Sequence, residues 1–334
     1  MRENHAEWLA SHTEEIIDPK REIIDPHHHL WPMRHGSRYE LPEFFADFES
    51  GHNVTKTVFI ECGAGYQRNS PEPMAPVAET TYVEAMAQEV AQTPARPQIA
   101  AIVAHANLTL PIETLDTVLD AHAAASPRFR GIRHAGAWDE ERDILQFAGQ
   151  PIQHLYLDPD FQRGVAHLGT RGLTYDTWHF HPQNREFLSL ARAVPDTTLI
   201  LDHFGTPMGV GRFTGKRDAR FSEWQDEMSA LAECPNVIAK LGGLAMPTNG
   251  FGWDTRDGPP PSSDEIVEAH EKYYAHMIAE FGPDRCMFES NFPVDKYSVS
   301  YPVLWNALKK LAAPYDAAAQ EAMFVGTAAR VYTI

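Results

Sequence analysis

The chain has 334 residues, of which 43% are hydrophobic, and it carries a formal net charge of −18 at pH 7. The hydrophobic share is ordinary for a globular protein with a sizeable core. Because so acidic a surface repels nucleic acid and anionic membranes, we expect neither as a partner. The polar N-terminus lacks the apolar segment of a secretory signal, and no apolar run has the length of a membrane span, so we expect a cytoplasmic protein.

Three cysteines, Cys62, Cys234 and Cys286, are spread along the chain. Their odd number and the absence of a C-x-x-C pair argue against a disulfide framework. We interpret them as small, buried residues of a protein in a reducing compartment.

Short β-rich apolar runs alternate with longer amphipathic runs from one end of the chain to the other. Their spacing predicts eight strands and at least six helices. The predicted strands are 22–29, 54–62, 99–104, 129–134, 173–181, 198–203, 237–241 and 286–291. The predicted helices are 77–92, 111–124, 185–194, 221–232, 264–281 and 303–311.

Strands that alternate with helices favour a parallel sheet, either closed as a barrel or open and doubly wound. An open dinucleotide-binding sheet needs a glycine-rich turn after its first strand, but this first strand ends in three histidines. We therefore predict an α/β protein with a single (β/α)8 TIM barrel over residues 21–334, after an N-terminal extension of residues 1–20. Long loops are predicted at 205–215 and 246–263, on the side of the barrel where active sites lie.

The first predicted strand ends with Asp25, Pro26, His27, His28 and His29. Because alternate residues of a strand share a face, Asp25, His27 and His29 are expected to point into the barrel and His28 toward the helices. Two imidazoles in this spacing can hold one divalent metal ion. A histidine-rich surface loop is the alternative, which the preceding apolar residues disfavour.

Histidines also end the fifth and sixth predicted strands. His179 and His181 share a face on the fifth, and His181, nearest the strand end, is a candidate third metal ligand. His203 ends the sixth, where it can act as base, acid or further ligand. A lone strand histidine is often a hydrogen-bonded core residue, so the evidence is that three strands end in this way.

Charged residues end three other predicted strands. Arg133, beside His134, can hold a substrate carboxylate, or it can form an internal ion pair. Lys240 lies among apolar residues and needs a partner, either a substrate or a carboxylate. Glu61 is a site residue or the partner of Lys240 or Arg133. We count Arg133, His134, Lys240 and Glu61 as candidate substrate-binding residues, together with Trp178 and Asn291.

The segments D-x-H-H-H-L-W, G-I-R-H, D-x-W-x-F-H-P-Q, L-D-H-F-G and S-N-F-P-V-D-K, in this order, resemble the amidohydrolase superfamily. The resemblance is to its amidohydrolase-2 branch, which includes lactonases and aminocarboxymuconate-semialdehyde decarboxylase, and the first and last segments look most like the lactonases. It implies a (β/α)8 barrel, a small-molecule substrate and a homodimer. It also implies that His27, His29 and His181 hold a metal such as zinc or manganese, and that the sixth-strand His203 assists catalysis.

The aspartate that the resemblance implies at the eighth strand is replaced by Asn291. An amide oxygen carries no charge to offset a divalent cation and cannot act as a base, so we expect weak metal binding or none. Glu289 lies two residues earlier and can take over as ligand or as general base, and Asp295 is the other candidate. The alternative for Glu289 is an ion pair with Lys240.

Three functions follow. The first is hydrolysis of a small lactone, carboxylated or sugar-like, with or without a metal, in which His203 and Glu289 or Asp295 take the proton. The second is metal-dependent non-oxidative decarboxylation of a small aromatic or unsaturated acid. The third is a non-catalytic ligand-binding barrel. A binuclear amidase is disfavoured, because the fourth predicted strand ends in Arg133 and His134 and offers no lysine to bridge two metals.

Overall fold

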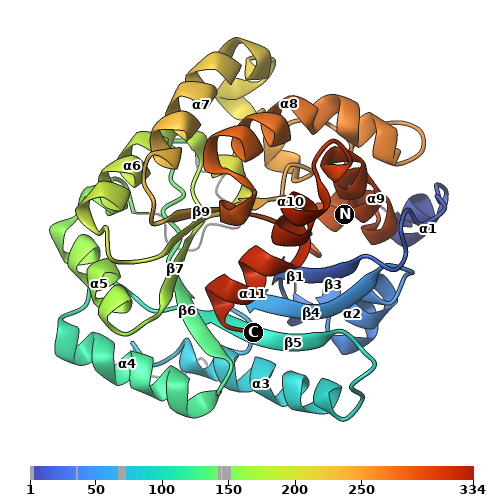
Figure 1. Ribbon diagram of the computed structural model, residues 1–334. Coiled ribbons are helices and arrows are strands. Elements are labelled where there is room, and N and C mark those ends of the chain that lie inside the picture. The colour runs from blue at the N-terminus through green and yellow to red at the C-terminus, as the bar shows by residue number, and fades with distance from the viewer. Residues whose placement is uncertain (1–3, 35–36, 67–72, 142–143, 145–151) are drawn as a thin grey trace.

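The computed structural model describes residues 4–34, 37–66, 73–141, 144 and 152–334. Eight parallel strands follow one another around a barrel in chain order, and a parallel bridge between His28 and Phe292 joins the first strand to the segment that follows the last (Figure 1). They are β1 (Glu22–His28), β4 (Asn53–Ile60), β5 (Gln98–Ala104), β6 (Phe129–Arg133), β7 (Thr174–Thr177), β8 (Leu199–Leu201), β9 (Val237–Leu241) and β10 (Cys286–Phe288). The predicted α/β TIM barrel is confirmed.

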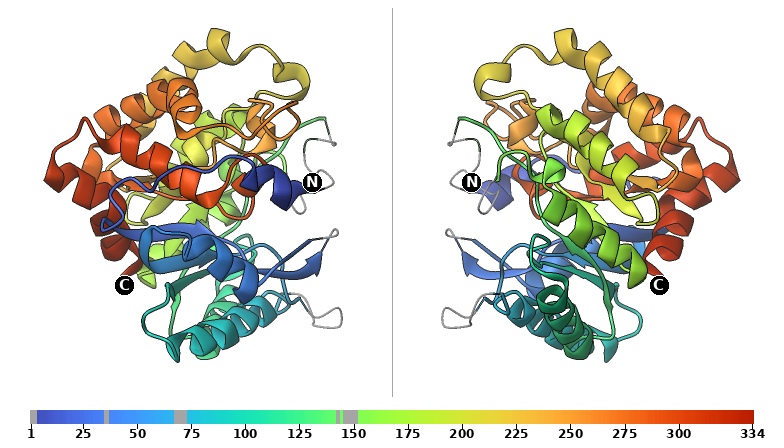
Figure 2. Two further views of the ribbon diagram at one scale, coloured as in Figure 1. Left: turned by 90° about the vertical axis from the view of Figure 1, so that its right-hand side faces the viewer. Right: turned by 90° about the vertical axis from the view of Figure 1, so that its left-hand side faces the viewer.

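Helices surround the barrel on its outside (Figures 1 and 2). They are α2 (Leu41–Phe48), α3 (Val77–Ala91), α4 (Ile112–Ala125), α5 (Pro159–Thr170), α6 (Asn184–Ala193), α7 (Arg217–Ala232), α8 (Ser263–Phe281) and α9 (Tyr301–Ala312). All six predicted helices are present, whereas α2 and α5 were not predicted. A short hairpin of β2 (Trp31–Arg34) and β3 (Ser37–Tyr39) follows β1. No helix in the described part of the chain is long and apolar enough to cross a membrane.

Six of the eight strands end one to four residues earlier than their sequence predicts. β7 ends at Thr177, β8 at Leu201 and β10 at Phe288, so the polar residues that follow lie on turns. His181 and His203 each begin a 3-10 turn, at η3 (His181–Gln183) and η4 (His203–Gly205). His203 and Asn291 both have a φ of 54°. Strand alternation therefore does not decide where these side chains point.

Strand β1 contains an irregularity that reverses its alternation. The register with β4 shifts between Asp25 and His28. Ile24 packs in the apolar interior of the barrel, whereas the Asp25 carboxylate accepts hydrogen bonds from Tyr301 Oη of α9 and from the backbone N–H of Ser290, each at 3.0 Å. The expectation that Asp25 shares a face with His27 is therefore wrong. His28 points outward, as predicted, against aromatic rings of α2.

The end of the barrel away from the active-site loops is closed by α11 (Thr327–Tyr332), which lies across the strands in Figure 1. Tyr332 packs in the same apolar cluster as Ile24, and its backbone oxygen accepts a hydrogen bond from Arg130 near the start of β6. Its hydroxyl donates to Asp176 Oδ2 at 2.6 Å. The last helix therefore supports the charged groups in the barrel from below.

The residues before β1 lie against the barrel. Helix α1 (His5–Ala10) is followed by an extended segment beside α8 and α9 (Figure 1). Glu14 accepts hydrogen bonds from the backbone N–H of Ser263 and from Asn306, and Lys309 donates to the backbone oxygen of Ile17. These contacts tie the N-terminal segment to two helices of the barrel.

Candidate active site

Three buried side chains meet where β1, β8 and β10 end. His27, His203 and Glu289 each offer a ligand atom, and these atoms lie within 4.8 Å of one another. Glu289 Oε1 is 2.6 Å from His203 Nδ1, and Glu289 Oε2 is 2.9 Å from His27 Nδ1. One carboxylate thus contacts both imidazoles. Glu289 and His203, whose catalytic roles remain predictions, are in direct contact.

The backbone around His203 is shaped to bring the ring to Glu289. The turn that follows β8 holds His203 at a positive φ, a conformation that few residues other than glycine adopt readily. Gly243 lies against the ring, because a Cβ atom at this position would come within 2.4 Å of His203 Nδ1. Glycine after β9 therefore leaves the space that the imidazole occupies.

Burial sets the protonation of this group. Desolvation lowers the pKa of His203 to about 3 and that of His27 well below its ordinary value, and the nearby Lys240 charge adds to both shifts. Desolvation also raises the pKa of Glu289 to about 8, against the opposing effect of Lys240. Both imidazoles are therefore neutral near pH 7, and each retains a nitrogen lone pair.

Lys240 lies beneath the group, fully buried, with two carboxylate partners. Its ammonium is 2.8 Å from Asp176 Oδ2 and 3.3 Å from Asp202 Oδ1, and 3.4 Å from His27 Nδ1. Among the described residues these are its ion pairs, so the predicted alternative of a direct Lys240–Glu289 pair is wrong. Of the two partners that the apolar surroundings of Lys240 predicted, a substrate or a carboxylate, the structure shows carboxylates, those of Asp176 and Asp202.

Arg133 is paired at the mouth of the barrel. Its Nε donates to Glu61 Oε1 at 2.8 Å, its Nη2 donates to the backbone oxygen of Glu61, and its Nη1 is 3.8 Å from Asp202. Glu61 is therefore the partner of Arg133. The two buried cations thus face four carboxylates, which are Glu61, Asp176, Asp202 and Glu289.

This donor set fits a divalent cation. When its carboxylates are ionised, the cluster holds two more negative than positive charges, and buried charge needs compensation. His27 Nε2 is a buried nitrogen without a hydrogen-bond partner among the described residues. Two neutral imidazoles and one carboxylate are also a donor set that suits zinc. Once a cation displaces its proton, Glu289 supplies the negative charge that Asn291 cannot.

His29, another predicted ligand, lies next to this group. Its ring centroid is 5.0 Å from that of His27, and its Nδ1 donates to the backbone oxygen of Ile60 at 2.8 Å. This hydrogen bond leaves Nε2 as the nitrogen with the lone pair. His29 can therefore assist the group of three from its edge.

Four other predicted residues lie elsewhere in the structure. His134 packs against Phe161 of α5 and accepts a hydrogen bond from the backbone N–H of Leu108, on the outside of the barrel. Trp178 lies in a small apolar cluster with Phe180. Asn291 donates a hydrogen bond to Asp295 Oδ1. The other oxygen of Asp295 accepts from the backbone N–H of Ala245, so this carboxylate contacts Asn291 and the backbone rather than the two histidines.

His181 stands apart from His27, His203 and Glu289 as well. It is not among the ligand atoms that lie within 4.8 Å of one another in the described chain. Its ring contacts Phe213, and its Nδ1 accepts a hydrogen bond from the backbone N–H of Met208 at 3.1 Å. The structure therefore brings His27 and His29 together, but not His181 with them.

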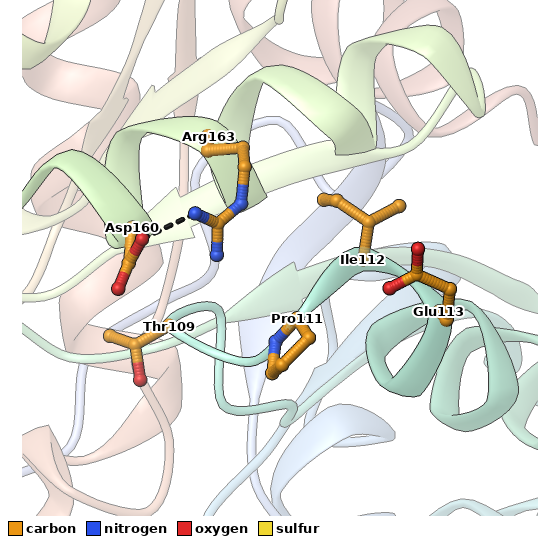
Figure 3. A pocket seen from close by; sticks show the side chains of 6 residues that line it. All are labelled: Thr109, Pro111, Ile112, Glu113, Asp160 and Arg163. Atoms are coloured by element: carbon orange, nitrogen blue, oxygen red, sulfur yellow. Dashed lines mark hydrogen bonds and ion pairs between the residues drawn. The ribbon is translucent and has the colours of Figure 1, made fainter.

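A wide surface cavity lies on the outer ring of helices. It is lined by Thr109, Pro111, Ile112, Glu113, Asp160 and Arg163, at the beginnings of α4 and α5 (Figure 3). Arg163 is paired with Asp160 there, and none of the buried histidines of the barrel lines the cavity. We therefore place the chemistry at the barrel mouth.

Comparison with known proteins identifies a matching family model and several relatives. A family model described as amidohydrolase matches residues 24–334. An uncharacterised protein of Sinorhizobium fredii is 32% identical over 89% of this chain and 86% of its own length. An L-fucono-1,5-lactonase of Burkholderia multivorans is 30% identical over 62% of this chain and 64% of its own length. A Burkholderia multivorans amidohydrolase with bound HEPES has a similar structure, with a TM-score of 0.71 and 25% identity over 94% of this chain and all of the other; a second crystal form of that protein contains zinc.

Proposed function

The chain belongs to the amidohydrolase family. On that basis we propose that it hydrolyses the ring ester of a small lactone, either sugar-like or carrying a carboxylate. The observation that supports this most is the contact of Glu289 with both His203 and His27. In this contact His203 is the proton acceptor and Glu289 is the group that orients its ring, an arrangement suited to general-base catalysis of ester hydrolysis. The lactonase relative has the same type of reaction in its name.

The His203–Glu289 pair takes one proton from the attacking water. The water oxygen bonds to the ester carbonyl carbon, the ring C–O bond breaks, and the pair returns the proton to the alkoxide that leaves. Glu289 holds the His203 ring in one orientation through Nδ1, so little reorganisation is needed when the proton moves. Arg133, at the mouth, is placed to attract negative charge on the substrate.

A divalent cation fits the same group of residues. In a metal-loaded protein His27, His203 and Glu289 would hold the cation instead of taking the proton, with His29 beside them. When bound, such a cation supplies Lewis acidity toward the carbonyl oxygen and lowers the pKa of a bound water. The charge of Glu289 at this position removes the main objection that Asn291 raised against a metal.

The same donor set favours one second candidate, a metal-dependent decarboxylase. That reaction depends on a firmly held metal, and Glu289 offers the carboxylate for it. Release of carbon dioxide from small aromatic acids, with no hydrolysis of lactones, would favour this candidate.

The test is a panel of lactones, with acid release followed by a pH indicator. The panel contains 1,5- and 1,4-lactones of sugar acids, carboxylated lactones and simple neutral lactones. We expect turnover of at least one class by the purified protein, with and without added zinc or manganese, and a loss of about 10²- to 10⁴-fold in kcat for Glu289→Gln. The variant Glu113→Gln, which changes an exposed residue on α4, is the control. No turnover of any lactone, or full activity of Glu289→Gln, would reject the proposal.

A further inference from the structure

A second, small cavity lies near the turn that holds His203, between the turn η3, the loop after η4 and the helices α7 and α8. His181, Met208, Arg217, Arg220, Trp224 and Tyr273 contribute to its wall. Its volume is about 20 Å³. That is enough for one water-sized group, such as a single oxygen of a carboxylate or a phosphate whose remaining atoms lie outside the cavity.

His181 presents a hydrogen-bond donor to this cavity. Its side chain is 5% exposed, and its Nδ1 accepts a hydrogen bond from the backbone N–H of Met208. A neutral imidazole that accepts at one nitrogen carries its hydrogen on the other. The Nε2–H of His181 is buried and has no partner among the described residues. A buried donor of this kind needs an acceptor.

Two arginines of the same cavity lie in the first turn of α7. Arg217 follows directly on Lys216 and Arg220 comes three residues later, at the end of the helix where the backbone dipole already favours negative charge. The positive charges of these side chains repel one another and the positive end of the helix dipole. This arrangement is unusual on a chain with a net charge of −18, and a bound anion would offset it.

Neighbouring groups occupy these arginines only in part. Arg217 Nη1 donates to the backbone oxygen of Asn249, and Arg220 Nη2 is 3.1 Å from Glu223 Oε2. The Nε–H of Arg220 is buried and has no hydrogen-bond partner among the described residues. Two unpartnered donors, one on His181 and one on Arg220, therefore belong to one cavity.

The lining has no carboxylate to hold a cation. Nearby, Asp218 is paired with Lys272, and Glu223 with Arg220. A metal ion at His181 would face two arginines and a nitrogen that carries a hydrogen. The cavity chemistry therefore opposes the metal role expected for His181 and favours a negatively charged oxygen.

We propose that His181, Arg217 and Arg220 form a binding site for the oxyanionic end of a small molecule, a carboxylate or a phosphate. The site adjoins the turn that holds His203. The backbone N–H of His181 donates to the backbone oxygen of Thr206, and the backbone N–H of Thr206 donates to the backbone oxygen of His203. The binding itself does not depend on the proposed lactonase activity.

The experiment measures binding of inorganic phosphate and of acetate to the full chain by calorimetry, with sodium chloride used to hold the ionic strength constant. We expect saturable binding of at least one of the two anions, weakened about tenfold or more in His181→Gln and in the double variant Arg217→Gln/Arg220→Gln. Arg185→Gln, which changes an exposed arginine of α6, is the matched control and should bind as the unmodified protein does. Absence of binding to the unmodified protein, or equal binding by all variants, would overturn the proposal.

A second measurement needs no variant to fold. Nitrogen-detected spectra of the histidine side chains should show the Nε2–H of His181 shifting on addition of the anion, while that of the surface His154 does not. An unchanged His181 signal at saturating anion would likewise overturn the proposal.

Kinetics then distinguish the two sources of the oxyanion. If it is part of the substrate, the double variant raises KM about tenfold or more for carboxylated lactones and leaves KM for neutral lactones unchanged; this arm rests on the proposed function. If the oxyanion is a separate small molecule, phosphate or acetate still binds to the unmodified protein, and the double variant leaves KM unchanged for both classes of lactone. Failure of the lactone panel with anion binding intact would reject the lactonase alone.

Discussion

Glu289 and His203, which lie 86 positions apart in the chain, are joined by a contact of 2.6 Å between Oε1 and Nδ1. The same carboxylate reaches His27 through its other oxygen. Every assignment at the barrel mouth depends on this carboxylate, because it orients both imidazoles and carries the charge that a cation would need.

Zinc affinity provides the first prediction. We expect Glu289→Gln to bind Zn²⁺ about 10- to 100-fold more weakly than the unmodified protein, because the amide keeps the shape of the side chain but removes its charge. Competition with a chromogenic chelator measures the affinity. Glu113→Gln is the surface control, and His181→Gln should also leave the affinity unchanged. A drop with His181→Gln alone would return the metal site to the histidine set that the sequence predicted.

The second prediction concerns the space beside His203. Alanine at Gly243 would place a Cβ atom 2.4 Å from the His203 ring, at a φ of +75°. We expect Gly243→Ala to lose about a hundredfold in kcat through displacement of the ring.

Gly172→Ala is the matched control for that prediction. Gly172 has a φ of +67°, but no heavy atom lies within 4 Å of the place that a Cβ atom would take, so its alanine carries the backbone strain without the contact. Gly243→Ala should lose at least as much stability as Gly172→Ala in urea unfolding, and only Gly243→Ala should lose activity. Equal kcat in the two variants would show that Gly243 does not position His203.

Lys240 provides the third prediction, on stability. Lys240→Met leaves Asp176 and Asp202 buried without their cation, so we expect a loss of about 3–5 kcal/mol in the free energy of unfolding. Lys272→Met removes an exposed partner of Asp218 on the surface and should change stability little. Denaturant unfolding of the three proteins measures this. Similar stabilities for the two variants would mean that the buried aspartates do not need Lys240.

The fourth prediction is a pH dependence. Because burial raises the pKa of Glu289 from 4.5 to about 8, the folded metal-free protein holds a proton that the unfolded chain releases at lower pH. The contribution of Glu289 to the free energy of unfolding therefore falls as pH rises from about 4.5 to 8 and levels off above that. The buried histidines, whose pKa values are lowered, act in the opposite direction only below about 6.5.

Urea unfolding between pH 7 and 8, in a chelating buffer, isolates the carboxylate. In Glu289→Gln we expect the decline in stability with pH to be shallower by up to about 1.4 kcal/mol per pH unit. Asp25, Asp202 and Glu79, whose pKa values are also raised by burial, retain the rest of the slope. The slope should be unchanged in Glu113→Gln. An unchanged slope in Glu289→Gln would place the pKa of Glu289 outside this range.

The sequence was sufficient to predict the barrel, because eight apolar runs separated by amphipathic helices leave few other architectures. It also pointed to Glu289 and His203, since ionisable residues at strand ends meet at one mouth. Lys240 in an apolar strand implied a partner, either a substrate or a carboxylate. The identity of that partner needed three-dimensional neighbours, because Asp176 and Asp202 come from two different strands.

Strand alternation did not carry beyond the strand ends. His181 was predicted from a strand that stops at Thr177, and the 3-10 turn that follows has its own geometry. Asn291 has a positive φ, and its side chain turns to Asp295. At Asp25 the irregularity in β1 moved the carboxylate toward α9. Local backbone conformations of this kind follow from tertiary packing, which a residue pattern does not record.

The bridge between His28 and Phe292 closes the barrel along a seam between the first strand and the segment that follows the last. His27 and Glu289 lie on opposite sides of this seam, so their contact closes a loop of some 260 residues in the chain. Loops of this length are entropically costly to close. A cation held by both residues would therefore stabilise the closed barrel, and on its removal we expect the first and last strands to separate before any other pair.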